Sequence, residues 1–326
     1  MKINKFIMSV GIISALTFLP SCSDDDKDTP DVGNNDFSEL EKPAMADEAV
    51  KYDVTTPGSD ISSIELTESG QYIITRSGAY FYSAQSTDSR LATKARHALG
   101  HSRAADPNYI CGSYIKVGEN EYILDGYGSV VITGSSNNGI ELIISPEDGD
   151  PFTVGAQQDT ALFDTSEETI ALCRSWNPTQ IRMRVLLNGK VMADESGAYK
   201  DYNKVMERIA RKLASYNPDE YDDDDFIFDD ALANEVIFTR SGSYVVFFDD
   251  DTLTPRIWRW SDRKNMQLQY SFYLDGFDYP EYTGYVTAGF NGHSVVLYEK
   301  QVESDYEDGD AMTVAYETWI TATEKI

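Results

Sequence analysis

Cysteine is scarce in this chain of 326 residues, which contains only Cys22, Cys111 and Cys173. So few thiols cannot build the disulfide framework that small secreted domains use in place of a large core. Cys111 and Cys173 fall in what we predict below to be different domains, and isolated thiols of this kind are most often free and buried. We therefore expect both to be unpaired, although an oxidising compartment would allow them to form a disulfide.

Histidine is equally rare, and the motifs of common catalytic sites are missing. The chain has three histidines, and it contains no Gly-x-Ser-x-Gly elbow, no His-Glu-x-x-His helix and no phosphate-binding loop. Its 55 acidic residues make any pair of carboxylates uninformative as a sign of glycosidase chemistry. The sequence therefore predicts a protein that is not an enzyme and that uses no cofactor.

Basic residues are outnumbered, since 27 lysines and arginines stand against 55 aspartates and glutamates, a net charge of −28. A surface this acidic repels nucleic acid phosphates and anionic lipid headgroups, so we expect no nucleic acid partner. The one basic patch that the sequence shows is residues 85–108, which include His97 and His101. The spacing of these histidines suits zinc, but no nearby Cys, Asp or Glu completes a zinc ligand set. We interpret this segment as a polar insertion and predict no metal site.

Long apolar runs are absent except at the N-terminus. Lys2 and Lys5 precede the stretch FIMSVGIISALTF, which has the length of a secretion signal. It is too short to span a bilayer comfortably, which takes about 20 residues. The stretch ends in LPSC, which resembles the lipobox of bacterial lipoproteins. The resemblance implies cleavage of residues 1–21, acylation of Cys22 on its thiol and amine, and attachment to a membrane through that lipid.

An acidic segment, SDDDKDTPDVGNND, follows directly. Its Pro, Gly and clustered acids cannot bury enough apolar surface to fold, so we predict that residues 22–57 form a solvated tether. An acidic run behind the lipid cysteine also resembles the surface-export signal of Bacteroides-type lipoproteins. Ser23 stands where inner-membrane retention requires Asp. These resemblances imply a protein that is anchored in the outer membrane and exposed at the cell surface.

Beyond the tether, short runs alternate apolar and polar residues, which is typical of β-strands that are buried on one side. Examples are SIELTESGQYIITR, EYILDGYGSVVITG, EVIFTRSGSYVVFF and MTVAYETWITAT. Asp-Gly and Asn-Gly pairs between such runs suit tight hairpins. We predict a mainly β protein with two antiparallel β-sheet or barrel domains, an N-terminal domain at residues 58–160 and a C-terminal domain at residues 161–326.

Three landmarks occur in the same order in both halves of the chain. TESGQY (67–72) matches TRSGSY (239–244), LDG (124–126) recurs at 274–276, and EDGDPFTV (147–154) recurs as EDGDAMTV (307–314). This order indicates that one β-unit has been duplicated, and we expect the first copy to have fewer strands.

The acidic segments are interpreted as turns. In EDGD the acids pass straight into a strand and point to opposite faces, whereas a calcium loop needs several converging oxygens. FDDDT at 248–252 is expected to be a turn as well. The four aspartates at 222–225 leave weak calcium binding open as an alternative.

One helix interrupts the β pattern. In KDYNKVMERIARKLASYNPDE, Val205, Ile209, Leu213 and Tyr216 follow one another at steps of three and four residues. Asn217-Pro218 ends the helix. The apolar stripe predicts that the helix packs on a barrel or sheet.

The second half of the chain, about 155 residues from Leu172, resembles the lipocalin-like domains of Bacteroides-type lipoproteins. The resemblance rests on EVIFTRSGSYVVFF, IWRW and LQYSFYL: a Gly-x-Tyr strand, a strand with tryptophans, and then meandering hairpins. Where lipocalins carry Gly-x-Trp near the first strand, this chain has Arg174-Ser175-Trp176. The resemblance implies a small antiparallel barrel with one inserted helix, and an eight-stranded barrel has room for one small ligand.

Aromatic residues supply the candidate binding site. Trp258 and Trp260 lie two residues apart on one predicted strand and therefore share a face, as do Tyr270 and Phe272 on the next strand. One interpretation is that they fill the interior of the barrel. The others are that they contact a small ligand there, or that they stack on a sugar from an open sheet.

Tyr279 and Tyr282, in a predicted loop, are further candidates for contact with a glycan or a protein. Together these features predict a non-enzymatic surface lipoprotein that binds a small apolar ligand or a glycan. The alternative is a structural or protein-interaction lipoprotein of the cell envelope, which would combine a filled barrel with a large exposed apolar patch.

Overall fold

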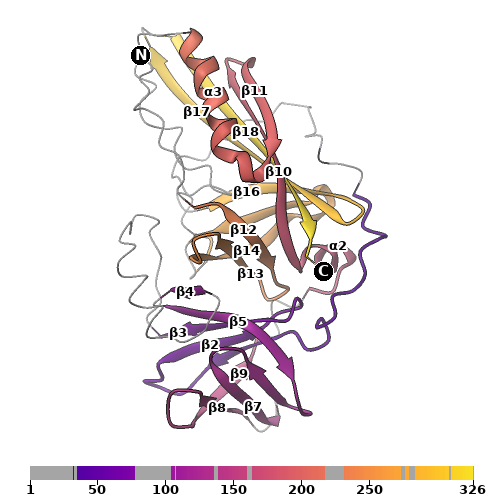
Figure 1. Ribbon diagram of the computed structural model, residues 1–326, viewed down its shortest axis with the longest axis vertical. Helices are drawn as coiled ribbons and strands as arrows, with labels where there is room; N and C mark the ends of the chain where they lie inside the picture. The colour runs from indigo at the N-terminus through magenta and orange to yellow at the C-terminus, as the bar shows by residue number, and fades with distance from the viewer. Residues whose placement is uncertain are drawn as a thin grey trace. The chain divides into compact units, whose positions relative to one another are not determined.

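The computed structural model describes residues 32, 35–77, 104–106, 108–135, 139–159, 164–216, 231–272, 276–278, 283–307 and 310–325 (Figure 1). Several candidates from the sequence therefore lie outside the described residues: the signal at 1–21, Cys22, His97, His101, the aspartates at 222–225, Tyr279 and Tyr282.

The first sheet is a closed antiparallel barrel of eight strands. Its members are β1 (Val50–Val54), β2 (Ile61–Leu66), β3 (Gln71–Arg76), β5 (Tyr109–Lys116), β6 (Glu121–Leu124), β7 (Gly128–Ser135), β8 (Gly139–Pro146) and β9 (Phe152–Gln158). Each strand pairs with the next along the chain, and β9 closes the barrel by pairing with β1. The short strand β4 (Ala104–Asp106) adds to β5 as a ninth member of the sheet.

The second sheet is built in the same way. Its eight barrel strands are β10 (Ser175–Leu187), β12 (Ala233–Phe238), β13 (Ser243–Phe248), β14 (Leu253–Asp262), β15 (Gln267–Ser271), β16 (Thr283–Asn291), β17 (Ser294–Glu307) and β18 (Asp310–Glu324). Here β18 closes the barrel by pairing with β10. The added strand is β11 (Lys190–Ala198), which pairs with the other side of β10.

The two barrels thus have the same connectivity, so the expectation that the first copy has fewer strands is wrong. Each of the three sequence landmarks lies in the equivalent connection of the two barrels. The first lies between β2 and β3 and between β12 and β13, the second between β6 and β7 and between β15 and β16, and the third between β8 and β9 and between β17 and β18. Strand β1 is hard to recognise in sequence because its five residues contain few alternations and lie within the predicted tether.

The first landmark has the same hydrogen bonds in both copies. In each copy, a threonine hydroxyl accepts a hydrogen bond of 3.0 Å from the backbone N–H four residues later. A glycine with positive φ makes the turn. The tyrosine that follows the turn is fully buried. The residues are Thr67, Gly70, Gln71 and Tyr72 in the first turn and Thr239, Gly242, Ser243 and Tyr244 in the second. Only glycine takes this left-handed conformation at little cost, which explains why it recurs.

The acidic turns are as expected where they can be seen. Residues 147–150, the first EDGD, are exposed and connect β8 to β9. Residues 249–252 form the turn between β13 and β14, in which the Asp250 carboxylate accepts a 2.9 Å bond from the N–H of Thr252. The second EDGD lies partly outside the described residues.

Two α-helices occur in the described segment 164–216. The expected helix is α3 (Tyr202–Tyr216), which packs against β11 and buries Val205, Ile209 and Leu213. Tyr216 was expected in this stripe but is 57% exposed, because it lies at the last residue of the helix. A short helix that the sequence did not predict, α2 (Glu167–Leu172), is capped by Ser166 and precedes β10.

The tether is shorter than the predicted residues 22–57. Strand β1 begins at Val50, whose side chain is buried, and Phe37 stacks edge-on against Phe290 with ring centroids 5.7 Å apart. The backbone of Asp36 also exchanges hydrogen bonds with β16 and the turn after it. Sequence composition hides these contacts, because single apolar residues anchor a segment that is otherwise polar.

Spatial clustering divides the chain into two compact units. Unit 1 comprises Met1–Leu40, Trp176–Val236 and Arg256–Ile326, and unit 2 comprises Glu41–Ser175 and Ile237–Pro255. The chain therefore does not divide simply at residue 160. Cys111 and Cys173 are both buried, and no disulfide joins them, as expected.

An ion pair within unit 2 is almost completely buried. The Glu68 side chain is only 3% exposed. Its carboxylate accepts a 2.8 Å hydrogen bond from Nε of Arg240 and a 3.2 Å hydrogen bond from the backbone N–H of Arg240. Burial raises the pKa of Glu68, while the Arg240 guanidinium opposes this shift. Arg240 also donates to the carbonyl oxygen of Ala46 at 2.6 Å. The pair is thus held by several charge-assisted bonds, and each partner depends on the other.

Replacing Arg240 with Ala should lower the free energy of unfolding at pH 7 by about 3 kcal/mol, because a buried carboxylate loses its partner. Chemical denaturation measures this loss. Lys42→Ala breaks an ion pair whose side chains are 52% and 84% exposed, and it should cost less than about 1 kcal/mol. Equal losses in the two variants would contradict the importance of the buried pair.

Candidate functional site

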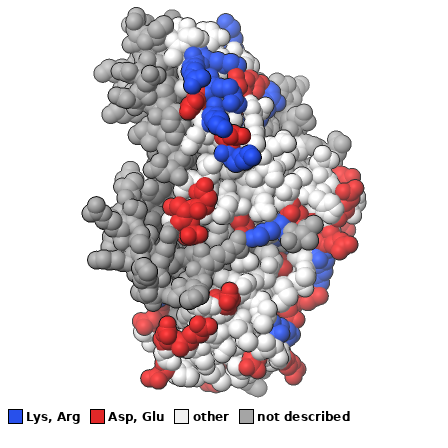
Figure 2. Space-filling view, viewed as in Figure 1, with Lys and Arg blue, Asp and Glu red and all other residues white. Residues whose placement is uncertain are grey.

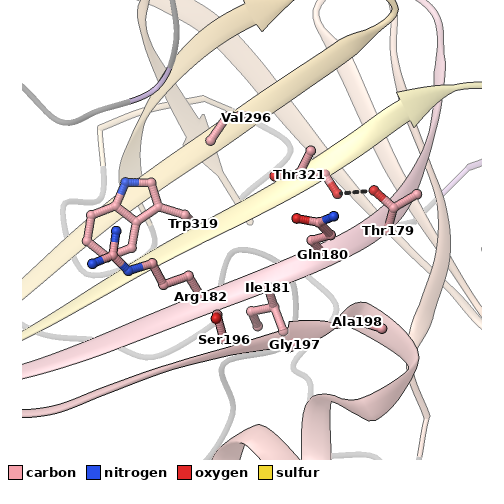
Figure 3. Close-up of a pocket in the computed structure, with 10 residues that line it drawn as sticks. All are labelled: Thr179, Gln180, Ile181, Arg182, Ser196, Gly197, Ala198, Val296, Trp319 and Thr321. Carbon is pink, nitrogen blue, oxygen red and sulfur yellow. Dashed lines mark hydrogen bonds between the residues drawn. The ribbon is translucent and has the colours of Figure 1, made fainter.

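A groove on the outside of the second barrel is the candidate functional site (Figure 3). Its volume is about 630 Å³, within the range of roughly 300–1,000 Å³ that is typical of small-molecule sites. The lining residues come from β10, β11, β17 and β18: Thr179, Gln180, Ile181, Arg182, Ser196, Gly197, Ala198, Val296, Trp319 and Thr321.

Strand register explains why these residues meet. Directly opposed residues of an antiparallel sheet share a face. One row across four neighbouring strands consists of Val296, Thr321, Gln180 and Ala198, and the next of Tyr298, Trp319, Arg182 and Ser196. The residues between these rows, such as Ile181 and Ile320, point into the barrel and are buried. The groove is therefore the outward face of the strands that close the barrel.

A β-bulge lies at one end of the groove. Pro178 pairs with Ala322 and Gln180 with Thr321, so Thr179 is an extra residue without a partner in the ladder. Its hydroxyl instead donates to the carbonyl oxygen of Thr321 at 3.1 Å (Figure 3). Bulges re-aim side chains and are frequent beside binding sites. Here Thr179 and Gln180 are left exposed at the groove.

Trp319 is the aromatic wall of the groove. The guanidinium carbons of Arg182 and Arg184 lie 5.0 and 5.1 Å from its ring centroid, and the ring of Tyr298 is 5.0 Å away. Cation–π contacts of this kind hold the indole in place. The side chain is 9% exposed, and its buried Nε1–H has no hydrogen-bond partner within the described part of the chain. A ligand oxygen that reached this N–H would satisfy it.

The next row of outward-facing residues, beyond the row that contains Trp319, is charged. Lys300, Glu317, Arg184 and Asp194 oppose one another across the same four strands. Arg182 also donates a bidentate pair of hydrogen bonds to Asp194, from Nε at 2.9 Å and from Nη2 at 2.7 Å to the two carboxylate oxygens. These bonds, led by that from Arg182, hold the pKa of Asp194 below its usual value. Arg182 is thereby fixed in position beside the indole.

Strand β11 forms the other wall, and α3 supports it. A Cβ atom at Gly197 would lie 3.1 Å from Cγ2 of Val205, so glycine allows the helix to approach closely. Arg208 of the helix donates to the carbonyl oxygen of Ser196 at 2.9 Å. The inserted helix therefore buttresses the strand that carries Ser196, Gly197 and Ala198.

The aromatic candidates from the sequence lie inside the barrel and do not line the groove. Trp258, Tyr270 and Phe272 are 5%, 2% and 9% exposed, and Trp260 is half-buried. As expected, each pair shares a face, with ring centroids 5.5 Å apart for the tryptophans and 5.6 Å for Tyr270 and Phe272. Trp258 and Tyr270 are also directly opposed across β14 and β15. The structure thus brings four of the six candidates together as part of the interior.

A buried acid lies next to these rings. Glu299 accepts hydrogen bonds from the Tyr270 hydroxyl at 2.9 Å and from the Gln301 amide at 3.2 Å. Arg256 lies over the Phe272 ring, with its guanidinium carbon 3.9 Å from the centroid. Burial outweighs these favourable contacts and raises the pKa of Glu299 to about 7. The carboxyl therefore titrates near neutral pH.

Sequence reasoning missed the groove residues. No role was assigned from sequence to the stretch NPTQIRMRV, although Gln180, Arg182 and Arg184 alternate there with buried residues. That alternation was the available signal for an outward polar face. Nothing in the sequence pairs β10 with β18, which lie more than a hundred residues apart.

No three His, Cys, Asp or Glu side chains among the described residues are close enough together to hold a metal ion. No helix in the described part of the chain is both long and apolar enough to cross a membrane. No protein-family model, curated protein or solved structure matches the chain.

Replacing Glu299 with Gln should stabilise the protein at pH 8 by about 2 kcal/mol and change it little at pH 4. Because the folded pKa of about 7 exceeds the ordinary value of 4.5, the folded state binds more protons between these values. Wild-type stability therefore falls as pH rises through that window, and the variant lacks this loss.

Denaturation curves at several pH values measure the effect, and the exposed Glu121→Gln serves as the control. Parallel pH profiles for wild type and Glu299→Gln would show that this carboxyl does not titrate as described.

Proposed function

We propose that this protein is a lipid-anchored lipoprotein of the bacterial outer membrane, exposed at the cell surface, and that it binds a glycan without catalysing a reaction. The N-terminal signal, LPSC and the acidic segment that follows support the location. The groove supports the binding role.

The chemistry of the groove carries the choice of a glycan. Its lining residues combine two threonine hydroxyls, a serine hydroxyl, the Gln180 amide and the Arg182 guanidinium with the largely buried Trp319 ring. Sugars present hydroxyl groups that require many hydrogen-bond partners and apolar ring faces that contact aromatic rings. The groove suits a sugar better than the small apolar ligand that the sequence also allowed, because few of its lining residues are large and apolar.

The path of the N-terminal segment fits a ligand at the membrane surface. Gly289 pairs with Val296 of the groove, and a Cβ there would lie 2.0 Å from the carbonyl oxygen of Val32. Val32 thus packs on the same outer face of the barrel. Cys22 is ten residues earlier in the chain, so a lipid there would lie within about 35 Å of this face.

A glycan array probed with the chain starting at Ser23 tests the proposal. We expect a set of related oligosaccharides to bind, and Gln180→Ala to weaken binding about tenfold because an exposed amide in the groove is lost. Isothermal titration measures the affinity for the best oligosaccharide.

Trp258→Phe, which changes the interior and not the groove, is the matched control and should bind as the wild type does. Loss of binding in the Trp258 variant while it remains folded, with full binding by Gln180→Ala, would move the site to the barrel interior. An array on which nothing binds would refute the glycan proposal.

One observation favours the alternative of a protein-interaction lipoprotein. On the hairpin of β5 and β6, Ile115 and Ile123 are directly opposed and are 59% and 43% exposed, and Val117 beside them is 48% exposed. Exposed apolar patches often mark protein interfaces. If this alternative holds, Ile123→Asp should remove a partner that chemical cross-linking traps on whole cells.

A further inference from the structure

The outer face of β14, β15 and β16 carries a second polar cluster, which we call the Arg259 cluster and which consists of Arg259, Gln269, Phe277 and Tyr285. The first two and the last of these residues are directly opposed across the three strands. Trp258, which precedes Arg259, is buried in the interior, and side chains alternate along a strand, so this row faces outward. None of these strands lines the groove, whose residues come from β10, β11, β17 and β18.

A directional chain of hydrogen bonds joins the three strands of the cluster. Nε and Nη2 of Arg259 donate to the amide oxygen of Gln269 at 3.0 and 2.8 Å, and the amide nitrogen of Gln269 donates to the hydroxyl oxygen of Tyr285 at 3.2 Å. A guanidinium can only donate, which fixes the orientation of the amide. Because the Tyr285 oxygen accepts, the hydrogen of its hydroxyl is left to donate outward. Gln269 is only 7% exposed, so it supports the two exposed side chains from below.

The outer end of the Arg259 guanidinium is open to a ligand. Its bonds to Gln269 use the edge formed by Nε and Nη2. The parallel N–H groups of Nη1 and Nη2 at the end of the guanidinium have no acceptor among the described residues. The Phe277 ring lies over the guanidinium, with its centroid 4.1 Å from Cζ. A ring in this position covers the planar face and leaves the end of the fork uncovered.

Arg259 also lacks an acid partner in a strongly acidic protein. Figure 2 shows acidic side chains spread over the visible face, with lysine and arginine side chains gathered over α3. The basic side chains of α3 form ion pairs with acids: Lys204, Arg208, Arg211 and Lys212. Among the described residues, no acid forms an ion pair with Arg259. Residues 257–271 contain three basic residues and one acid, whereas the whole chain has a net charge of −28.

We propose that the Arg259 cluster is a docking site for an acidic segment of a protein partner and that it binds a carboxylate of that segment. The cluster presents donors, namely the end of the guanidinium and the Tyr285 hydroxyl, and an ionised carboxylate presents only acceptors. The planar fork of an arginine matches the two oxygens of a carboxylate. The charge of Lys264, which is exposed in the turn between β14 and β15, adds to the attraction.

The composition of the cluster favours a protein partner over a saccharide. Tyrosine, phenylalanine and arginine are enriched at protein interfaces, and tyrosine and arginine are typical of the residues that dominate binding energy there. A sugar would need a free aromatic face, but the guanidinium already covers one face of Phe277. This inference does not depend on the glycan groove, because the two sites share no residue.

The test uses an octapeptide in which serine and glutamate alternate, and its control peptide has glutamine in place of each glutamate. Fluorescence anisotropy with the full chain in detergent measures both. In about 0.05 M salt the glutamate peptide should bind about tenfold more tightly than the glutamine peptide, and in about 0.5 M salt this advantage should fall to about twofold because the charges are screened.

Two substitutions separate the fork and the hydroxyl from simple charge. Arg259→Lys keeps the charge and removes the planar fork, so it should weaken binding of the glutamate peptide about fivefold. Tyr285→Phe removes one donor and should weaken binding about threefold. Arg211→Lys and Tyr216→Phe make the same changes at side chains that are exposed outside the cluster, and these control variants should bind as the wild type does.

The outcomes decide between partners. Equal binding of the two peptides, or equal binding of the glutamate peptide by wild type and folded Arg259→Lys, would overturn the inference. Binding of tetragalacturonate or of phosphatidylglycerol vesicles that Arg259→Lys weakens, without binding of the peptide, would assign the cluster to an acidic saccharide or a lipid surface instead. Gln180→Ala, which tests the groove, should bind the peptide as the wild type does, so this inference and the proposed function can fail separately.

Discussion

The pairing of β10 with β18 is the constraint on which the second barrel and its groove depend. These strands are the first and last of the barrel, and eleven residue pairs join them. The pairing removes the two open edges that such a sheet would otherwise expose. It also brings Gln180 and Arg182 beside Trp319 and Thr321, so one set of backbone hydrogen bonds both closes the barrel and builds the groove floor.

Because side chains alternate along a strand, some polar side chains of the second barrel face its interior and others face the outside. Glu299, Tyr270 and Arg256 lie in the interior, where burial brings a carboxyl to titrate near neutral pH. Arg182 and Trp319 lie on the outside. The helix α3 packs against β11 and has no counterpart among the described residues of the first barrel. The two barrels share their connectivity, and the added strand β11 with α3 is what distinguishes the face that carries the groove.

Local pattern was enough to predict the β class, the presence of two antiparallel β-sheet or barrel domains, α3 and the turn at the first repeated landmark, but not where the compact units divide. It also placed Trp258 with Trp260 and Tyr270 with Phe272 on shared faces. It did not predict that the first barrel is complete, because a strand as short as β1 offers little alternation and was assigned to the tether. It missed the groove because strands distant in sequence supply its residues, so that Arg182 and Trp319 become neighbours only when β10 pairs with β18.

We propose that the ligand binds outside the second barrel and leaves the interior undisturbed. The chain has four tryptophans, and each has an indole N–H that can be followed separately by nuclear magnetic resonance. We expect a bound saccharide to shift the Trp319 signal, through an N–H that has no partner among the described residues, and to leave that of buried Trp258 in place. A shift of the Trp258 signal with none at Trp319 would contradict the claim and place the ligand inside the barrel.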